Sequence, residues 1–287
     1  MDKKTFYKFV SPSLVVMGSL MVFPLAMAIW LGMNFITYRN LNAPAFVGLA
    51  NYADVLTHPK FWQAFWFTIR YIITIVPTTI VIGFFLAVFL DQTRQITRSF
   101  FISSYLLPMV IVPVVGTLMF KSLFEPSGLA TWVIREVFNQ RFIFSENTVK
   151  ALIYLNSIWG TTAFPFIVLY AGLLTLPKEQ IEAAIVDGAT RWQQIRYILV
   201  PHLSSLLVFL GLIQIMDAYR IFDSVFVMTE QNPVYNAESI MVYTFRTAMT
   251  VHRLGKANAM AVITVVMSLV VFIPLLVQTY CEQTMER

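Results

Sequence analysis

PKEQIEAAIVDGATRWQQIRYILVP, residues 177–201, is the stretch that decides the fold, because it is a polar segment between two long apolar runs. Its first half has the features of a short helix. Pro177 suits the first helical position, where its missing N–H costs nothing, and Glu179 follows where a carboxylate favours the positive helix end. Asp187-Gly188 predicts the end of this helix, since glycine readily adopts the left-handed cap conformation.

The second half of the segment predicts another short helix. Thr190 and Gln193 have the spacing of a capping box, in which each side chain accepts a hydrogen bond from the other residue's backbone N–H. Pro201 is expected to end this helix, because proline lacks the N–H that the helix ladder requires. Apolar side chains recur at helical spacing, at Trp192, Ile195, Ile198 and Leu199. We therefore expect two short helices joined at Gly188.

The spacing of this segment resembles the EAA loop of binding-protein-dependent ABC importer permeases. Glu182-Ala183-Ala184 is followed by Gly188 and then by Ile198-x-Val200-Pro201, where the family has Ile-x-Leu-Pro. In that family the loop is a cytoplasmic coupling helix that docks into a cleft on the ATPase subunit. The resemblance implies that the ATPase-coupling residues here are Glu182, Ala183, Ala184, Asp187, Gly188 and Pro201. The residues alone leave open a plain amphipathic hairpin between two membrane spans.

Composition places the chain among membrane proteins. Of its 287 residues, 58% are hydrophobic and 12% are charged, whereas soluble domains carry about 25% charge. The net charge of +5 comes from scattered basic residues, which predicts contact with lipid headgroups of the bilayer and argues against nucleic-acid binding. One cysteine and three dispersed histidines predict neither a disulfide nor a metal site.

Six apolar runs are long enough to cross a bilayer, whose ~30 Å core needs about 20 helical residues. We expect an all-α membrane protein with six transmembrane helices in one permease domain, 1–287, and the segment 177–201 between the fourth and fifth helices. The resemblance implies the type I importer fold. The expected spans are 11–36, 69–90, 100–120, 151–174, 203–229 and 260–280.

Basic residues predict the orientation of the chain. If the N-terminus is cytoplasmic, basic residues are denser in the segments on the inner side of the membrane than in those on the outer side. The short loop 91–99 is one example of a basic inner segment. We therefore expect both termini and the segment 177–201 in the cytoplasm. Ala26-Met27-Ala28 has the form of a signal cleavage site, but the apolar run continues to Ile36, so an uncleaved anchor is expected.

Two further stretches resemble the carbohydrate branch of these permeases. One runs from Phe46 to Tyr52, and the other has Phe222-Asp223 ahead of Thr229, although the two glycines that the branch places after this threonine are absent. The resemblance implies a subunit of a sugar importer in a prokaryotic plasma (inner) membrane. Its implied partners are a second homologous permease, an ABC ATPase dimer and an extracytoplasmic solute-binding protein.

The chain is not expected to be an enzyme. No phosphate-binding Gly-x-x-x-x-Gly-Lys-Ser/Thr loop occurs, and Gly255-Lys256-Ala257 is the nearest approach. We expect no catalytic residue, metal or cofactor on this chain, with ATP-Mg bound by the partner ATPase. An integral-membrane enzyme would need convergent His, Glu or Cys groups on neighbouring spans, which the sequence lacks.

Polar residues inside predicted spans indicate a substrate path, because unpaired polar groups are costly there. Taking the family's sugar-lining positions by their distance from the EAA-like motif implies Ser157, Thr161 and Phe164 in the fourth span and Gln214 in the fifth. The alternative for these residues is hydrogen bonding between helices. The candidate path residues are Ser157, Thr161, Phe164, Gln214, Asp217 and Arg220.

Asp217, Arg220 and Asp223 step by three and so lie near one helical face. We expect Asp217 and Arg220 to pair near the outer membrane boundary rather than to contact the solute. A secondary transporter or channel that uses these three charges is the alternative function, although no repeat supports it. Aromatic residues near the ends of the first two spans, expected to form an interfacial belt, are Trp30, Tyr38, Trp62, Trp66 and Tyr71.

Overall fold

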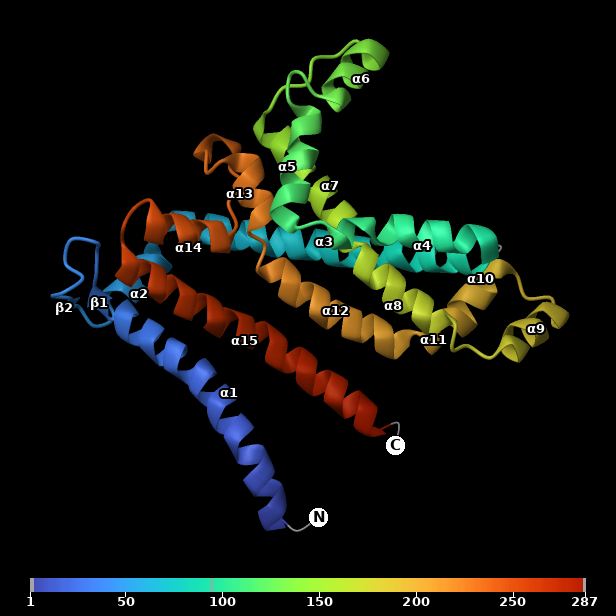
Figure 1. The fold of residues 1–287 in the computed structure, drawn as a ribbon, viewed down its shortest axis with the longest axis horizontal. Helices are drawn as coiled ribbons and strands as arrows, with labels where there is room; N and C mark the ends of the chain where they lie inside the picture. The colour runs from blue at the N-terminus through green and yellow to red at the C-terminus, as the bar shows by residue number, and fades with distance from the viewer. Residues whose placement is uncertain (1–2, 94, 286–287) are drawn as a thin grey trace. The chain divides into compact units, whose positions relative to one another are not determined.

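The computed structural model describes residues 3–93 and 95–285, which form two compact units. We call Met1–Gln63 with Ile240–Arg287 the terminal unit and Ala64–Ser239 the central unit. Apart from one two-residue strand pair, the elements of both units are helices (Figure 1). The described chain is mostly helical and contains long apolar helices, as the apolar runs predict.

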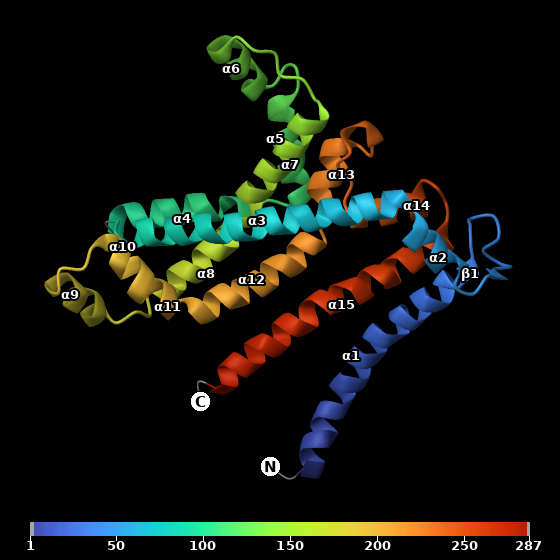
Figure 2. The ribbon, with the colours of Figure 1, turned by 180° about the vertical axis from the view of Figure 1, so that it is seen from behind.

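The terminal unit joins the two ends of the chain. Helices α1 and α15 contact each other, and both Figure 1 and the view from behind in Figure 2 show them as neighbours. Gly255, the second residue of α15, lies at a close approach of two chain segments, because a Cβ there would be 2.1 Å from the Asn34 carbonyl oxygen. Asn51 Nδ2 donates to the Gly32 and Asn34 carbonyls at 2.9 Å each. The elements are α1 (Lys3–Gly32), β1 (Asn34–Phe35), β2 (Ala45–Phe46), α2 (Ala50–Thr57), α14 (Ile240–Met249) and α15 (Leu254–Met285).

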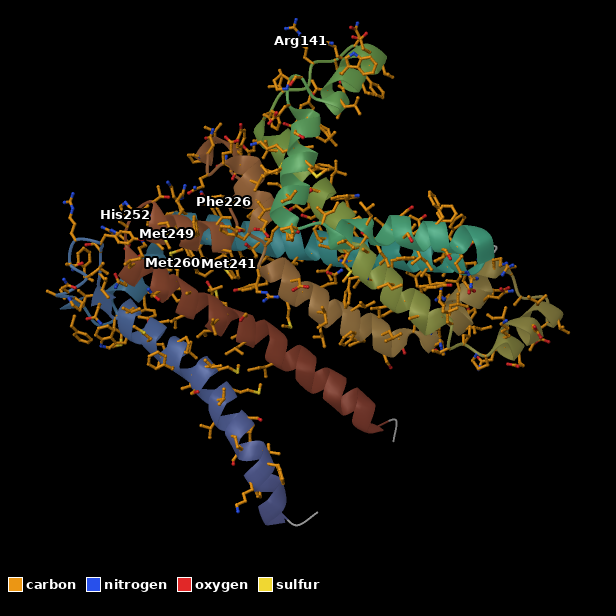
Figure 3. All side chains as sticks on the ribbon, viewed as in Figure 1. Arg141, Phe226, Met241, Met249, His252 and Met260 are labelled. Atoms are coloured by element: carbon orange, nitrogen blue, oxygen red, sulfur yellow. The ribbon has the colours of Figure 1, made fainter. Side chains whose placement is uncertain are left out.

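A loop contact closes the same unit. The Tyr38 hydroxyl donates a hydrogen bond to Met249 Sδ at 3.3 Å. The Tyr38 ring also packs edge-on against the His252 ring, with 4.8 Å between the ring centroids. Met249 and His252 are labelled in Figure 3. The antiparallel strands pair Asn34 with Phe46. These contacts hold the segment after α1 against the turn between α14 and α15.

The central unit carries the longest element, α3 (Pro59–Asp91), of which Ala64 onward belongs here. Its core is an apolar cluster around Phe84, Phe166, Leu169 and Leu210. The other elements are α4 (Gln95–Val110), α5 (Pro113–Phe124), α6 (Leu129–Phe138), α7 (Glu146–Thr161), α8 (Ala163–Leu173), α9 (Lys178–Val186), α10 (Arg191–Gln194), a π turn (Ile195–Leu199), α11 (Val200–His202), α12 (Ser204–Tyr219), α13 (Asp223–Thr229) and a 3₁₀ turn (Pro233–Tyr235).

Four helical stretches of the described chain are apolar and long enough to cross a membrane. They are Tyr7–Gly32, Pro59–Asp91, Glu146–Leu173 and Ser204–Thr229. A bent pair, Arg98–Val110 with Pro113–Phe138, makes a fifth if it is counted as one span. The expected span 260–280 lies in α15, whose apolar described part is Leu254–Val270, and it runs on into residues whose side chains the structure does not describe. The count of six spans and the single domain 1–287 stay predictions.

The stretch of the third expected span, 100–120, is not one continuous helix. The chain bends by 101° between α4 and α5. Pro113 begins α5, and the residue before it, Val112, is extended (φ −57°, ψ 127°). A proline disfavours the helical conformation in the preceding residue and cannot donate to the previous turn. Pro113 thus lies at the break between two helices, whereas Pro108, five residues earlier, lies inside α4 without ending it.

Two other expected boundaries also differ. The first span, expected over 11–36, ends at Gly32, where the chain turns into β1. The fifth, expected over 203–229, is interrupted between Tyr219 and Asp223, which separates α12 from α13. The interruption falls at Arg220, which lies between Asp217 and Asp223, the other charged residues in this apolar run.

Candidate functional site

The segment 177–201 begins with α9. Pro177 is the extended residue before the helix (φ −60°, ψ 127°) and not its first residue, which corrects the expected boundary by one position. After Asp187, Gly188 has a φ of +78°. A Cβ at Gly188 would meet no atom within 4 Å, so the backbone conformation and not the available space favours glycine there.

Two backbone hydrogen bonds close the end of α9. The Gly188 N–H donates to the Ile185 carbonyl at 3.0 Å, and the Ala189 N–H donates to the Ala184 carbonyl at 2.9 Å. This is the Schellman arrangement, in which a left-handed residue lets the chain satisfy the last helical carbonyls. The expected helix end at Asp187-Gly188 is confirmed.

The capping box at the start of the second helix is also confirmed. Thr190 Oγ1 accepts from the Gln193 N–H at 3.3 Å, and Gln193 Oε1 accepts from the Thr190 N–H at 2.7 Å. The neighbouring Gln194, which sequence reasoning missed, is buried and donates from Nε2 to the Ala189 carbonyl at 3.1 Å. This bond fixes α10 against the turn that follows α9.

Pro201 does not end the second helix as expected. It lies inside the short α11, and the chain continues through Leu203 into α12. The π turn Ile195–Leu199 precedes it. A proline ring in a regular helix clashes with the carbonyl four residues earlier, and the wider π turn moves that carbonyl away. The proline is therefore accommodated at a local widening.

The surface of this segment combines small, acidic and apolar residues. Glu182, Ala183, Asp187 and Gly188 are exposed, and Ala184 is half-buried. The segment exposes five large apolar side chains, of which Val200 is the least exposed. We call the other four the loop patch: Ile185, Val186, Trp192 and Tyr197. Val186 is 87% exposed. Exposed apolar side chains of this size are available for contact with a partner protein.

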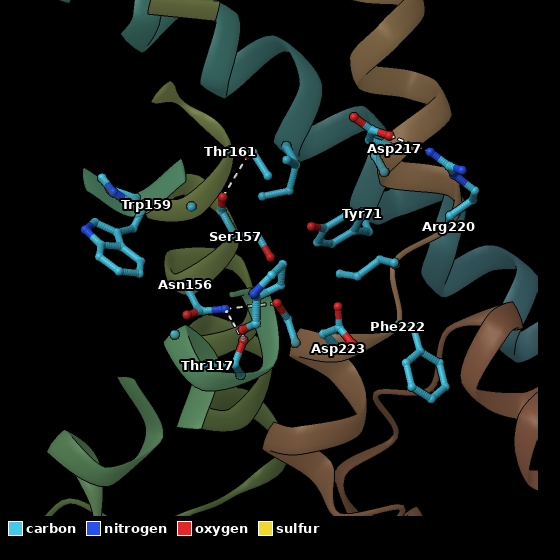
Figure 4. Close-up of a pocket in the computed structure, with 18 of the residues that line it drawn as sticks. Tyr71, Thr117, Asn156, Ser157, Trp159, Thr161, Asp217, Arg220, Phe222 and Asp223 are labelled. Carbon is cyan, nitrogen blue, oxygen red and sulfur yellow. Dashed lines mark hydrogen bonds and ion pairs between the residues drawn. The ribbon is translucent and has the colours of Figure 1, made fainter. Parts of the chain in front are cut away.

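A cavity of about 620 Å³ lies in the central unit, between α3, the α4–α5 bend, α7 and the α12–α13 break (Figure 4). The structure brings five of the six candidate path residues to its wall: Ser157, Thr161, Gln214, Asp217 and Arg220. Phe164 is not among the lining residues. It packs against the apolar core cluster of the unit.

Polar side chains of the cavity wall also form hydrogen bonds with the protein, either to a neighbouring helix or within their own helix. Buried Gln214 donates from Nε2 to Thr79 Oγ1 at 3.4 Å and to the Thr161 carbonyl at 3.3 Å. Ser157 donates within its own helix, to the Ile153 carbonyl at 2.7 Å. Gln214 thus lines the cavity, as expected of a path residue, and also forms hydrogen bonds between helices, as the alternative interpretation expected.

Asn156 is not among the six candidate path residues. It is buried, lines the cavity, and donates from Nδ2 to Thr117 Oγ1 at 3.1 Å and to Ser224 Oγ at 2.9 Å. These bonds link α7 to α5 and to α13. Its Oδ1 has no hydrogen-bond partner among the described residues.

Tyr71 corrects the interfacial-belt interpretation. It is buried, lines the cavity, and lies with its ring centroid 5.6 Å from that of Tyr154. The expected span began at residue 69, which put Tyr71 at a membrane boundary, whereas α3 begins at Pro59. Tyr71 and Ile75 are four residues apart and share one helical face, which is a signal that the sequence did contain.

The charges of the wall are concentrated on one side. Arg220 Nη2 and Asp217 Oδ1 lie 2.7 Å apart, so the expected pairing is confirmed, although both side chains are more than half exposed. Asp223, at the start of α13, is half-buried. In the described chain no group of three or more His, Cys, Asp or Glu side chains could hold a metal ion.

Comparison with known proteins gives consistent matches. The family model of the binding-protein-dependent transport system inner membrane component matches residues 56–287. A probable ABC transporter permease protein of Sinorhizobium fredii is 31% identical over 233 residues, covering 80% of this chain and 75% of that protein. The trehalose transport system permease protein SugA of Mycobacterium tuberculosis is 28% identical over 244 residues, covering 84% of this chain and 78% of that protein.

A solved structure has the same fold. It is a bacterial ABC transporter involved in the import of the acidic polysaccharide alginate, with a TM-score of 0.75 and 18% identity, and the alignment covers 96% of this chain and 98% of that one.

Proposed function

Because the chain belongs to the family of binding-protein-dependent transport system inner membrane components, we propose that it is the permease subunit through which a prokaryotic ABC importer moves a saccharide across the plasma membrane. The chain is an ABC transporter permease, a membrane subunit of a family without catalytic activity of its own. Our proposal concerns the class of solute, the segment that couples this chain to the ATPase, and the orientation of the chain in the membrane. The secondary-transporter alternative is not needed for a member of this family.

The observation that carries the proposal is a cavity, lined in part by polar side chains, between helices on either side of the segment 177–201 in sequence. Ser157 and Thr161 come from α7, before the segment, and Gln214 comes from α12, after it. A cavity of about 620 Å³ is within the range of about 300–1,000 Å³ typical of small-molecule sites. A movement of the segment would reach the α7 wall of the cavity through α8 and the α12 wall through α12 itself.

We assign ATPase coupling to the segment 177–201. The loop patch supplies apolar area for a protein interface, and Glu182 supplies an exposed carboxylate that can accept charge-assisted hydrogen bonds from a partner. Ala183 and Ala184 keep this face of α9 small enough to enter a cleft. The partner ATPase dimer binds ATP-Mg, and its closure moves the segment as a rigid body, which alternates access to the cavity.

A saccharide is the solute class that the relatives and the cavity support together. The relative from Mycobacterium tuberculosis is named for trehalose and the solved structure for alginate. The wall offers hydroxyl and amide groups for hydrogen bonds, and Trp159, which is 41% exposed, adds an aromatic ring.

A second homologous permease completes the path, and an extracytoplasmic solute-binding protein delivers the solute. Both termini of this chain lie in the cytoplasm.

Reconstitution tests the proposal. The chain is co-expressed with the partner subunits encoded beside its gene and placed in proteoliposomes, and uptake of labelled trehalose and maltose is followed with and without ATP on the ATPase side. We expect uptake that requires ATP and the binding protein, and no nucleotide binding by the isolated chain. Uptake driven by an ion gradient in the absence of ATP would contradict the importer mechanism.

A further inference from the structure

Three charged side chains line the cavity wall, and they are not equivalent. Asp217 and Arg220 form the ion pair of 2.7 Å. Asp223 takes part in no ion pair with any other residue that the structure describes. The remaining lining residues are uncharged. The wall that this chain contributes therefore has one excess negative charge, and that charge is on Asp223.

The position of Asp223 suits contact with a solute. It is the first residue of α13 and half-buried, and it follows the break after α12 (Figure 4). Trp159 lies on α7, a different wall of the same cavity. A carboxylate only accepts hydrogen bonds, and it accepts them strongly from hydroxyl groups. Hydroxyl groups of a sugar ring bound in this cavity can donate hydrogen bonds to Asp223.

We propose that Asp223 selects the charge class of the solute: it accepts hydrogen bonds from an uncharged, hydroxyl-rich saccharide and repels an acidic one. The inference rests on the proposed function and narrows it. A uronate carboxylate near Asp223 meets the repulsion of a like charge, which an uncharged sugar does not. Specificity here comes from this repulsion as much as from attraction.

Arg220 does not offset that repulsion. An acidic solute would need a free guanidinium group, and the Arg220 guanidinium is held by Asp217. Binding a uronate there would break an existing pair, leaving Asp217 as a second unpaired carboxylate on the same wall. The pair thus removes from solute recognition the one cation that the wall contains.

A structural role for Asp223 predicts a different outcome. A carboxylate in the first turn of a helix stabilises that helix through its dipole, so its removal would lower stability and affect all solutes alike. Charge selection instead predicts a change in the ratio between solutes. The ratio is therefore the quantity to measure.

The test uses the transporter complex in nanodiscs without the solute-binding protein, so that only the membrane subunits select. Binding of trehalose, maltose and a mannuronate disaccharide is measured by equilibrium dialysis for the wild-type chain and the variants Asp223→Asn and Asp223→Glu. Glu136→Gln, a change of the same charge on α6 outside the cavity, is the matched control. We expect wild-type binding of a neutral disaccharide to exceed uronate binding by at least about tenfold, the usual scale of one charge-assisted contact.

Asp223→Asn should reduce this ratio by about tenfold, whereas Asp223→Glu and Glu136→Gln should preserve it. Wild-type binding of the uronate equal to or tighter than that of both neutral sugars overturns the inference and leaves the saccharide proposal standing. An unchanged ratio in a monodisperse Asp223→Asn complex does the same. If no saccharide of either charge binds, the proposed solute class is wrong, and the inference is wrong with it.

Discussion

Lys256 Nζ lies 2.9 Å from Asp54 Oδ2, which joins the start of α15 to α2 in the terminal unit. The Lys256 side chain is 8% exposed and that of Asp54 is 44% exposed. The hydrogen bond from Lys256 is the main cause that holds the pKa of Asp54 below its ordinary value; the charges of Lys256, Arg253 and His58 add to it, and burial opposes it. The pair connects the segments on either side of the central unit in sequence.

This pair predicts a loss of stability in acid. Because the pKa of Asp54 is lower in the folded than in the unfolded chain, its contribution to the free energy of unfolding is complete above about pH 4, the ordinary value, and falls as the pH drops through the lowered folded value. Thermal unfolding in detergent across pH 3 to 7 measures it. The difference between wild type and Asp54→Asn should shrink below pH 4, and a difference that grows there would contradict the assignment.

The same pair predicts an asymmetry between single and double variants. Asp54→Asn leaves a buried ammonium without its carboxylate, and because Asp54 is partly exposed we expect a cost of about 1 kcal/mol in the free energy of unfolding. Adding Lys256→Met removes the unpaired charge and should recover part of that loss. A double variant less stable than Asp54→Asn alone would show that the pairing is not what stabilises this contact.

Gly188→Asp should abolish ATP-driven uptake while the protein remains in the membrane. The residue would carry bulk and charge at a left-handed position on the proposed coupling surface. Gly188→Asn is the matched comparison, because asparagine tolerates this conformation without a charge, and it should retain more uptake. Gly211→Ala, with no atom within 4 Å of its Cβ and no positive φ, should have no effect. Near-normal uptake by Gly188→Asp would exclude the coupling role.

Gln214→Leu and Glu182→Lys should separate the cavity from the coupling surface. Loss of a neutral hydrogen bond is worth about 0.5–1.5 kcal/mol, so Gln214→Leu should weaken apparent solute affinity about two- to tenfold while the ATPase still co-purifies. Its two bonds are long, at 3.3 and 3.4 Å, so the cost to folding should be small. Glu182→Lys should reduce ATPase co-purification and leave solute binding intact. Unchanged affinity and specificity in Gln214→Leu would make that residue purely structural.

Asn156→Ala should loosen the junction of α5, α7 and α13. It removes the hydrogen bonds to Thr117 and Ser224, and since such bonds between membrane helices average about 0.6 kcal/mol each, we expect a loss of about 1 kcal/mol. Asn147→Ala, an exposed change near the start of the same helix, is the control. Thermal unfolding of both variants measures the effect, and equal midpoints would show that the junction does not depend on Asn156.

The sequence by itself determined the features that depend on a few neighbouring residues. The left-handed Gly188 and the Thr190–Gln193 capping box follow from local backbone preferences and bonds within one helical turn. The apolar runs likewise predicted the helical membrane class, since a bilayer leaves backbone groups few other ways to be satisfied. The motif spacing predicted the family that the comparisons then established.

Only the tertiary structure decided where helices bend and which side chains meet. Pro108 and Pro113 look alike in sequence, yet one stays in a helix and the other starts a new direction, because each depends on how neighbouring helices satisfy the freed carbonyls. Tyr71, Asn156 and Asp223 come from α3, α7 and α13 and meet around one cavity. Helical periodicity assigns each of them to a face of its own helix, but the packing of the three helices determines that those faces point to the same space.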